Sequence, residues 1–214
     1  MSNNAYLDND DLMQPFIFPP DKKLIKSYKQ TIPVNIHHFY IVDEIEDVSP
    51  YLELINALKT AEQHDTIYIC INSPGGNLHT AIQIISAIKQ SQATVITSLD
   101  SLCCSAATLI FLSGHKFMVN PNCTFMIHNY SQFTGGKGNE LALQVKYQEE
   151  HFKTLADDIY GGFLTTDEIN SVVNGKDLWM GSSEIVRRLK NIKKVAKSST
   201  EDIDKPKKKT RRSK

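Results

Sequence analysis

The chain has 214 residues, of which 41% are hydrophobic and 22% charged, so it can form one globular domain with a sizeable core. No apolar run approaches the roughly 20 residues of a membrane span, and no basic segment leads into an apolar one at the N-terminus. We therefore expect a cytoplasmic protein with no membrane contact. The net charge of zero hides an asymmetry, because seven of the 24 basic residues lie in 205–214, leaving 17 basic against 24 acidic residues elsewhere.

Three regions are expected along the chain. Residues 1–30 are polar and interrupted by prolines, which predicts a flexible N-terminal arm. Residues 31–192 carry the periodic apolar pattern of a folded domain. Charge rises and periodicity disappears over 193–214, which predicts a disordered basic tail. Such a run is more often solvated than bound to nucleic acid, so we do not expect a nucleic-acid partner.

From residue 38 onward, short apolar strands alternate with helices. Ser49 before a proline is typical of a helix start, Asn77 of a helix cap, and Thr165–Glu168 of a capping box. The run 66–71 is apolar without alternation, which predicts a strand covered on both faces. Strands are expected over 38–42, 66–71, 94–99, 116–119 and 123–128, and helices over 50–63, 78–89, 105–113 and 139–160. Repeated strand–helix units imply parallel pairing and an α/β fold.

The four cysteines lie in apolar surroundings and lack the spacing of metal ligands. This pattern predicts buried thiols in a reducing compartment and no metal. The adjacent pair Cys103-Cys104 is either reactive or a pair of small core residues. The glycine-rich segment 134–138 lacks the spacing of a phosphate-binding loop, so no nucleotide cofactor is expected.

Ser105 opens the helix 105–113, which is apolar nearly all round and is therefore expected to be buried. Its hydroxyl would lie near the positive end of the helix dipole, a position that favours an incipient oxyanion. A serine at a helix N-cap needs no catalytic role, however, because its oxygen commonly accepts a hydrogen bond from the first turn. Ser105 alone is therefore consistent with a nucleophile and with a cap.

Two further segments supply groups that acyl-transfer chemistry uses. His128 ends an apolar strand, where a side chain can reach a reacting hydroxyl as a general base. Gly75-Gly76 ends another strand, and glycines there allow a backbone amide to approach a substrate carbonyl. Each feature is also explained by structure alone, as a buried histidine or a tight turn. The other histidines lie in more polar settings, at positions 37, 38, 64, 79, 115 and 151.

Taken in order, the blocks 71–76 (Ile-Asn-Ser-Pro-Gly-Gly), 103–114 and 126–128 (Met-Ile-His) resemble the proteolytic subunit of the Clp protease, ClpP, a serine peptidase family. The resemblance covers about residues 36–190. It implies an α/β fold of the ClpP/crotonase type, a superhelix of β–β–α units. It also implies that the long helix 139–160 is a protruding handle.

Carried over by position, the resemblance implies a Ser-His-Asp triad and no cofactor or metal. Ser105 would be the nucleophile, His128 the base, and Asp177 the residue that orients the imidazole. The backbone amides of Gly76 and Ala106 would form the oxyanion hole. The implied function is a serine endopeptidase that cleaves peptides or unfolded proteins.

The resemblance also implies partners: seven-fold rings of this chain stacked in pairs, and a separate AAA+ unfoldase, since the chain has no ATP-binding motif. The chain departs from the family pattern at Ser101, at Ala106-Ala107 after the serine, and at Arg187–Lys190. These departures bear on substrate preference, on the docking of a partner and on the geometry of the ring. Two alternatives remain open: a crotonase-type acyl-CoA enzyme on the same fold, and a non-catalytic ring subunit.

Overall fold

The structure is a computed structural model that describes residues 27–29 and 33–203, with side chains up to residue 192. The chain divides into two units, residues 1–33 and Val34–Lys214, and all the elements below belong to the second. The predicted N-terminal arm, residues 1–30, lies outside the described residues except for 27–29. Its flexibility remains a prediction.

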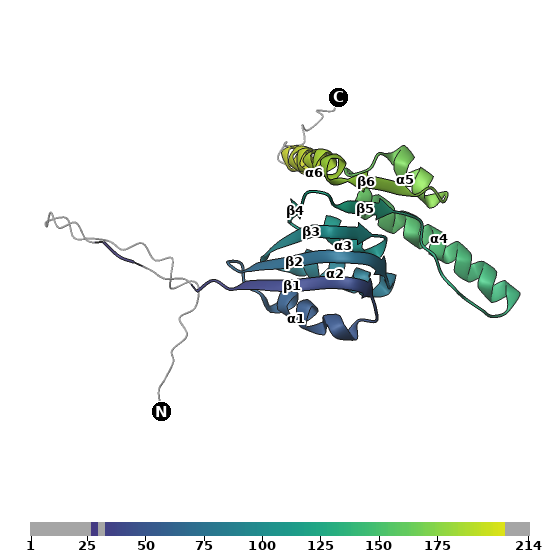
Figure 1. The fold of residues 1–214 in the computed structure, drawn as a ribbon, viewed down its shortest axis with the longest axis horizontal. Helices are drawn as coiled ribbons and strands as arrows, with labels where there is room; N and C mark the ends of the chain where they lie inside the picture. Colours follow the sequence, from purple (N-terminus) through teal and green to yellow (C-terminus); the bar gives the residue numbers. More distant parts are fainter. Residues whose placement is uncertain (1–26, 30–32, 204–214) are drawn as a thin grey trace, which may run out of the picture. The chain divides into compact units, whose positions relative to one another are not determined.

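The described elements confirm the predicted alternation of strands and helices (Figure 1). In chain order they are β1 (Ile36–Ile45), the short 3-10 helix η2 (Ser49–Tyr51), α1 (Leu52–Thr60), β2 (Thr66–Gly76), α2 (Leu78–Gln90), β3 (Thr94–Cys104), α3 (Ala106–Leu112), β4 (Lys116–Val119), β5 (Thr124–Ile127), α4 (Gly138–Tyr160), α5 (Thr166–Val173), β6 (Leu178–Gly181) and α6 (Ser182–Ile203). Helix α6 continues past residue 192, where the domain was expected to end. The tail predicted to be disordered spans 193–214; α6 includes its first part, to Ile203, and residues 204–214 lie outside the described residues.

The strands form one six-stranded sheet in the order β1-β2-β3-β5-β6, with β4 pairing to β3 beside this path. All pairings are parallel except the last, between β5 and β6, which is antiparallel. Parallel pairing brings the carboxyl ends of β2, β3 and β5 to the same edge of the sheet. Ligands in α/β proteins bind at such an edge.

Helices α1, α2 and α3 pack on one face of β1–β3 (Figure 1). The prediction that 66–71 is covered on both faces is wrong, because burial in β2 alternates. Ile67, Ile69 and Ile71 face the helices and are fully buried, whereas Tyr68 and Cys70 point to the other face and are half-buried. The apolar composition of β2 therefore reflects one helix-covered face and one partly open face.

Strand β3 changes partner halfway along its length. Its first half, Ile96–Leu99, pairs with β4, and its last residues, Leu102–Cys104, pair with β5. The change coincides with an irregularity against β2, where Leu99 pairs with Ile71 but the next recorded pair joins Cys103 to Ser73. This shift lets β4 and β5 follow each other along one strand, and it places the end of β3 beside the end of β5.

Helix α3 lies at the centre of the core, and all seven of its residues are buried. This confirms the prediction from its all-round apolar composition. Phe111 of α3 contacts two other aromatic rings, with centroid distances of 5.5 Å to Phe117 and 5.7 Å to Phe125. The start of α3, where the proposed nucleophile lies, is thus fixed by a densely packed helix.

Helix α4 has two different halves. Phe152, Ala156, Ile159 and Tyr160, in its C-terminal half, are buried against the body. The N-terminal half extends away from the sheet (Figure 1), and its apolar residues Leu143, Val145 and Tyr147 are exposed. Because large apolar side chains rarely stay exposed in groups on a monomer, this half is a candidate contact surface.

An ion-pair cluster around Arg188 joins α5 to α6. The Arg188 guanidinium donates two hydrogen bonds to Glu168, of 2.7 and 2.8 Å, and one of 2.6 Å to Glu184. Glu168 also completes the predicted capping box with Thr165, which the structure confirms. These bonds, led by those from Arg188, hold the pKa of Glu168 at about 2. The Arg188 side chain is 16% exposed and the Glu168 side chain 29% exposed, so the pair is only partly shielded from solvent.

This cluster makes stability depend on acid pH. Because the pKa of Glu168 is lower in the folded chain than in the unfolded one, its stabilisation is complete above about pH 4.5 and is lost as the pH falls toward 2. We expect Glu168→Gln to remove about 2 kcal/mol of this acid-sensitive stability, less than the full linkage value because the pair is partly exposed. Urea unfolding at pH 7, 5 and 3 measures it. The exposed Glu140→Gln is the matched control, and equal pH slopes for Glu168→Gln and wild type would contradict the assignment.

Within the described residues, no helix is both long and apolar enough to cross a membrane. The same residues contain no group of three or more histidine, cysteine or carboxylate side chains that could hold a metal ion.

Candidate active site

Three sequence-predicted segments converge at the carboxyl edge of the sheet. Strand β2 ends at Gly76, β3 leads directly into Ser105, and β5 leads into His128. The Ser105 backbone N–H donates a 2.8 Å hydrogen bond to the Met126 carbonyl of β5, which ties the two strand ends together. The parallel order β2-β3-β5 is therefore what assembles these residues from positions far apart in the sequence.

Ser105 occupies a strained corner between β3 and α3. Its φ of 55° and ψ of −129° lie in a region that residues with a side chain rarely adopt. Although Ser105 is the N-cap of α3, its hydroxyl makes no capping hydrogen bond. The capping explanation thus fails for this serine, and strain of this kind is typical of functional positions. A serine on a strained strand-to-helix turn is also the arrangement of the nucleophile elbow, here without its glycine motif.

Gly75 lies directly behind this corner. A Cβ on Gly75 would come within 2.6 Å of both the Ser105 Cβ and the Cys104 carbonyl oxygen, and its φ of 100° also requires glycine. The Gly75 N–H donates to the Ser73 hydroxyl at 3.1 Å. Gly75 therefore supports Ser105 by close backbone approach, and its amide is already engaged. Gly76 is the glycine that faces the site.

A small cavity of about 70 Å³ brings four of the five predicted site residues together. Its lining is Gly76, Leu78, Ser105, Ala106, Leu109, His128, Tyr130, Ser131, Phe152 and Tyr160. Ala106 is the first residue of α3, and the first N–H groups of a helix have no acceptor within it. Hydroxyl, imidazole and backbone amides therefore share one cavity with apolar walls.

Asp177 is the predicted site residue that does not line this cavity. It is exposed, and the hydrogen bonds of the described residues include none from His128 to Asp177 or to Ser105. Strands β5 and β6 pair up to Ile127 opposite Leu178, and continuing this antiparallel register by one residue would face His128 with Asp177. Side chains directly opposite in such a pair have Cβ atoms about 4.5–5.5 Å apart.

The cysteines near the site are core residues. Cys103 and Cys104 are 0% and 4% exposed, and burial raises the pKa of both thiols. A raised pKa leaves little of the reactive thiolate at neutral pH. Of the two interpretations open from the sequence, the structure favours core packing. All four cysteines are free thiols.

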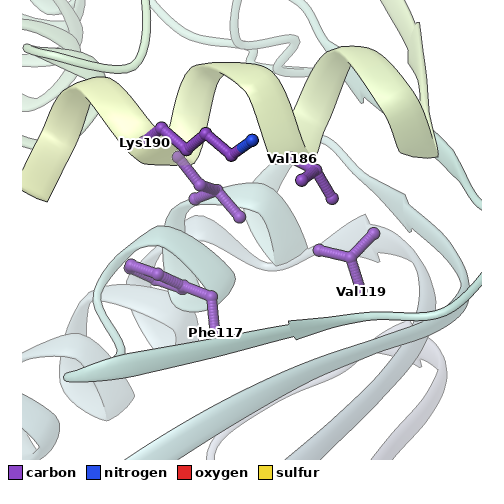
Figure 2. Close-up of a pocket in the computed structure, with 5 residues that line it drawn as sticks. Phe117, Val119, Val186 and Lys190 are labelled. Atoms are coloured by element: carbon purple, nitrogen blue, oxygen red, sulfur yellow. The ribbon is translucent and has the colours of Figure 1, made fainter.

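A larger groove lies between β4 and α6, away from these residues. Figure 2 shows Phe117 and Val119 on the strand facing Val186 and Lys190 on the helix, and Leu189 completes the lining. The groove has a volume of about 230 Å³. It is apolar apart from the Lys190 amine and contains no nucleophile paired with a base. The smaller cavity at Ser105 is therefore the better candidate for chemistry.

The sequence did not single out the cavity walls made by Tyr130, Phe152 and Tyr160. Tyr130 and Phe152 pack with ring centroids 5.6 Å apart, and Tyr160 is the last residue of α4. All three come from the segment after β5, and no local motif connects them to Ser105. The positions of Phe152 and Tyr160 in the sequence do not tell which other element they border.

Comparison with known proteins identifies one family. A family model described as Clp protease matches residues 35–188, which contain all the candidate site residues.

Among curated proteins, the chain is 36% identical over 123 residues to an ATP-dependent Clp protease proteolytic subunit of Streptococcus pneumoniae and 28% identical over 123 residues to that of Streptococcus gordonii. Each alignment covers 55% of this chain and 62% of the relative. This chain is also 29% identical over 117 residues to ATP-dependent Clp protease proteolytic subunit 3, chloroplastic, of Arabidopsis thaliana. That alignment covers 52% of this chain and 38% of the relative. The chain thus spans less than two thirds of the length of these relatives.

Proposed function

Because the chain belongs to the Clp protease family, as its motifs predicted, we propose that it is a serine endopeptidase with a Ser105-His128-Asp177 triad. The observation that carries this proposal is Ser105 itself. Its backbone is strained, its hydroxyl is not used as a helix cap, and it shares a cavity with His128 and two candidate amide donors. A structural serine needs none of these features.

The proposed reaction is acyl transfer to Ser105. The imidazole of His128 removes the hydroxyl proton as Ser105 Oγ attacks the substrate carbonyl, and it then protonates the leaving amine. Water hydrolyses the resulting acyl-enzyme with the same base. The N–H groups of Gly76 and Ala106 stabilise the oxyanion in each tetrahedral intermediate. Asp177 holds the imidazole in the correct tautomer.

The proposed partners are further copies of this chain, a separate AAA+ unfoldase, and peptides or unfolded proteins as substrates. The relatives are named ATP-dependent, whereas this sequence has no phosphate-binding loop, so ATP hydrolysis would come from the unfoldase. The exposed apolar half of α4 supports contact between copies. A cytoplasmic location and the absence of a cofactor remain predictions.

A fluorophosphonate probe tests the proposed function most directly. We expect it to label the wild-type protein at Ser105, because such probes react with an activated serine and not with an ordinary one. Peptide mapping identifies the labelled residue. Labelling at Ser98, Ser101 or Ser113 would contradict the site. An assembled protein that stays unlabelled would favour the non-catalytic subunit.

Assembly is tested through α4. We expect native mass spectrometry to show a ring of this chain, and replacement of Leu143 and Tyr147 by serine to weaken the contact between rings. These side chains are 69% and 63% exposed, so the fold of one subunit should tolerate the change. Thr154→Ser, in the C-terminal half of the same helix that packs on the body, is the matched control. A monomer with full peptidase activity at micromolar concentration would contradict the ring.

A further inference from the structure

A chain of buried hydrogen bonds connects the end of α4 to the Ser105 carbonyl. The backbone carbonyl oxygen of Ser105 accepts a hydrogen bond of 2.9 Å from the Thr108 N–H and one of 2.6 Å from the Thr108 hydroxyl. The Thr108 hydroxyl oxygen lies 2.8 Å from the Tyr160 hydroxyl. A threonine hydroxyl has one proton. Since Thr108 donates it to Ser105, Tyr160 must be the donor to Thr108.

The side chains that form these hydrogen bonds are buried. Thr108 is 0% exposed and Tyr160 2% exposed. Burial raises the pKa of Tyr160, so its hydroxyl keeps the proton that it donates to Thr108. In such surroundings hydrogen bonds are strengthened, and a donor or acceptor left without its partner is destabilising. The bonds therefore hold the Ser105 carbonyl in one direction.

The direction of this carbonyl determines the direction of an amide. The C=O of Ser105 and the N–H of Ala106 belong to the same planar trans peptide and point in opposite directions. Fixing one group fixes the other. The peptide follows a residue whose φ of 55° and ψ of −129° are rarely adopted by residues with a side chain, and these bonds restrain its orientation there.

We propose that Thr108 and Tyr160 are positioning residues that hold the Ser105–Ala106 peptide so that the Ala106 N–H points at the developing oxyanion. This inference rests on the proposed function, in which Ser105 is the nucleophile. It adds a connection from α4 to the oxyanion hole. Neither residue touches the reacting atoms in this role, and both act through the backbone of Ser105.

The test separates transition-state stabilisation from substrate binding. Thr108→Val keeps the shape of the side chain and removes the hydroxyl. We expect kcat for a short peptide to fall about 10- to 100-fold with KM little changed, somewhat less than for removal of an oxyanion donor. Affinity for a peptide aldehyde, which forms a tetrahedral adduct on Ser105, should fall by the same factor. Thr108→Ser should restore both, and Tyr160→Phe should give a smaller loss.

Ser113→Ala is the matched control, because the Ser113 hydroxyl donates the same kind of bond, 2.8 Å to the Leu109 carbonyl, at the other end of α3. It should leave kcat and aldehyde affinity unchanged. Wild-type kcat and aldehyde affinity in Thr108→Val, or an equal loss of both in Ser113→Ala, would overturn this inference but leave the proposed function intact. Should Thr108→Val not fold, Tyr160→Phe decides by the same two readouts. A wild-type protein that neither cleaves peptides nor binds the aldehyde would overturn the proposed function, and this inference with it.

Discussion

Ser105→Ala is expected to abolish peptide hydrolysis, with a fall in kcat of about 10⁶-fold, as for loss of the nucleophile in other serine peptidases. The alanine side chain cannot form the acyl-enzyme, and only the oxyanion hole and substrate binding would remain. The fold should persist, because the Ser105 hydroxyl makes no capping bond whose loss would destabilise α3. Hydrolysis of a fluorogenic peptide, with circular dichroism of the same sample, measures both.

Ser101→Ala is the control for this experiment. Ser101 lies on β3, the strand that leads into Ser105, but it is exposed and does not line the cavity. The Ser101→Ala variant should therefore have wild-type activity. Substantial activity in Ser105→Ala would show that another group performs the attack.

Asp177→Asn is expected to lower kcat by about 10⁴-fold. An asparagine in this position keeps the size of the side chain but favours the wrong imidazole tautomer, so His128 could no longer accept the Ser105 proton. The register of β5 and β6 would place Asp177 opposite His128, one residue beyond the pair Ile127–Leu178. Steady-state kinetics of the assembled protein give the value.

A double-mutant cycle decides whether Asp177 acts through His128. If it does, Asp177→Asn should cause almost no further loss in a His128→Ala background, because the interaction is already absent. Asp167→Asn, an exposed carboxylate in the first turn of α5, should have normal activity and serves as the control. A normal rate for Asp177→Asn would remove this residue from the triad.

Local patterns predicted most of the elements because they act within a few residues. The capping box at Thr165–Glu168 and the all-round apolar helix α3 both follow from short stretches of sequence, and the structure confirms both. The open face of β2 did not follow. An apolar strand looks the same whether its second face is covered by this chain or left partly open, so composition alone could not decide between them.

The site was predictable only in part for a related reason. Its residues end or follow parallel strands, so their convergence at one edge followed from the fold class. The positive φ of Ser105 did not follow, because the groups that contact this turn, Gly75 behind it and the Met126 carbonyl, are distant in sequence. Tyr160 lies 52 residues from Thr108, and no periodicity connects the two.

The short antiparallel strand β6 divides the proposed triad between two parts of the fold that differ in their resistance to opening. Ser105 and His128 directly follow strands β3 and β5 of the parallel sheet, whereas Asp177 directly precedes a four-residue strand that pairs with β5 alone. Residues 174–177 are exposed, whereas the chain after them is held by the buried Met180, by the Ser182 hydroxyl, bonded to Cys123 and Asn120, and by the Arg188 cluster. Segments with few buried contacts open sub-globally, below the free energy of complete unfolding, and their amides exchange hydrogen first. If Asp177 has the proposed role, we expect a warmed protein to lose this carboxylate, and with it most peptidase activity, while the sheet that positions Ser105 and His128 is still intact.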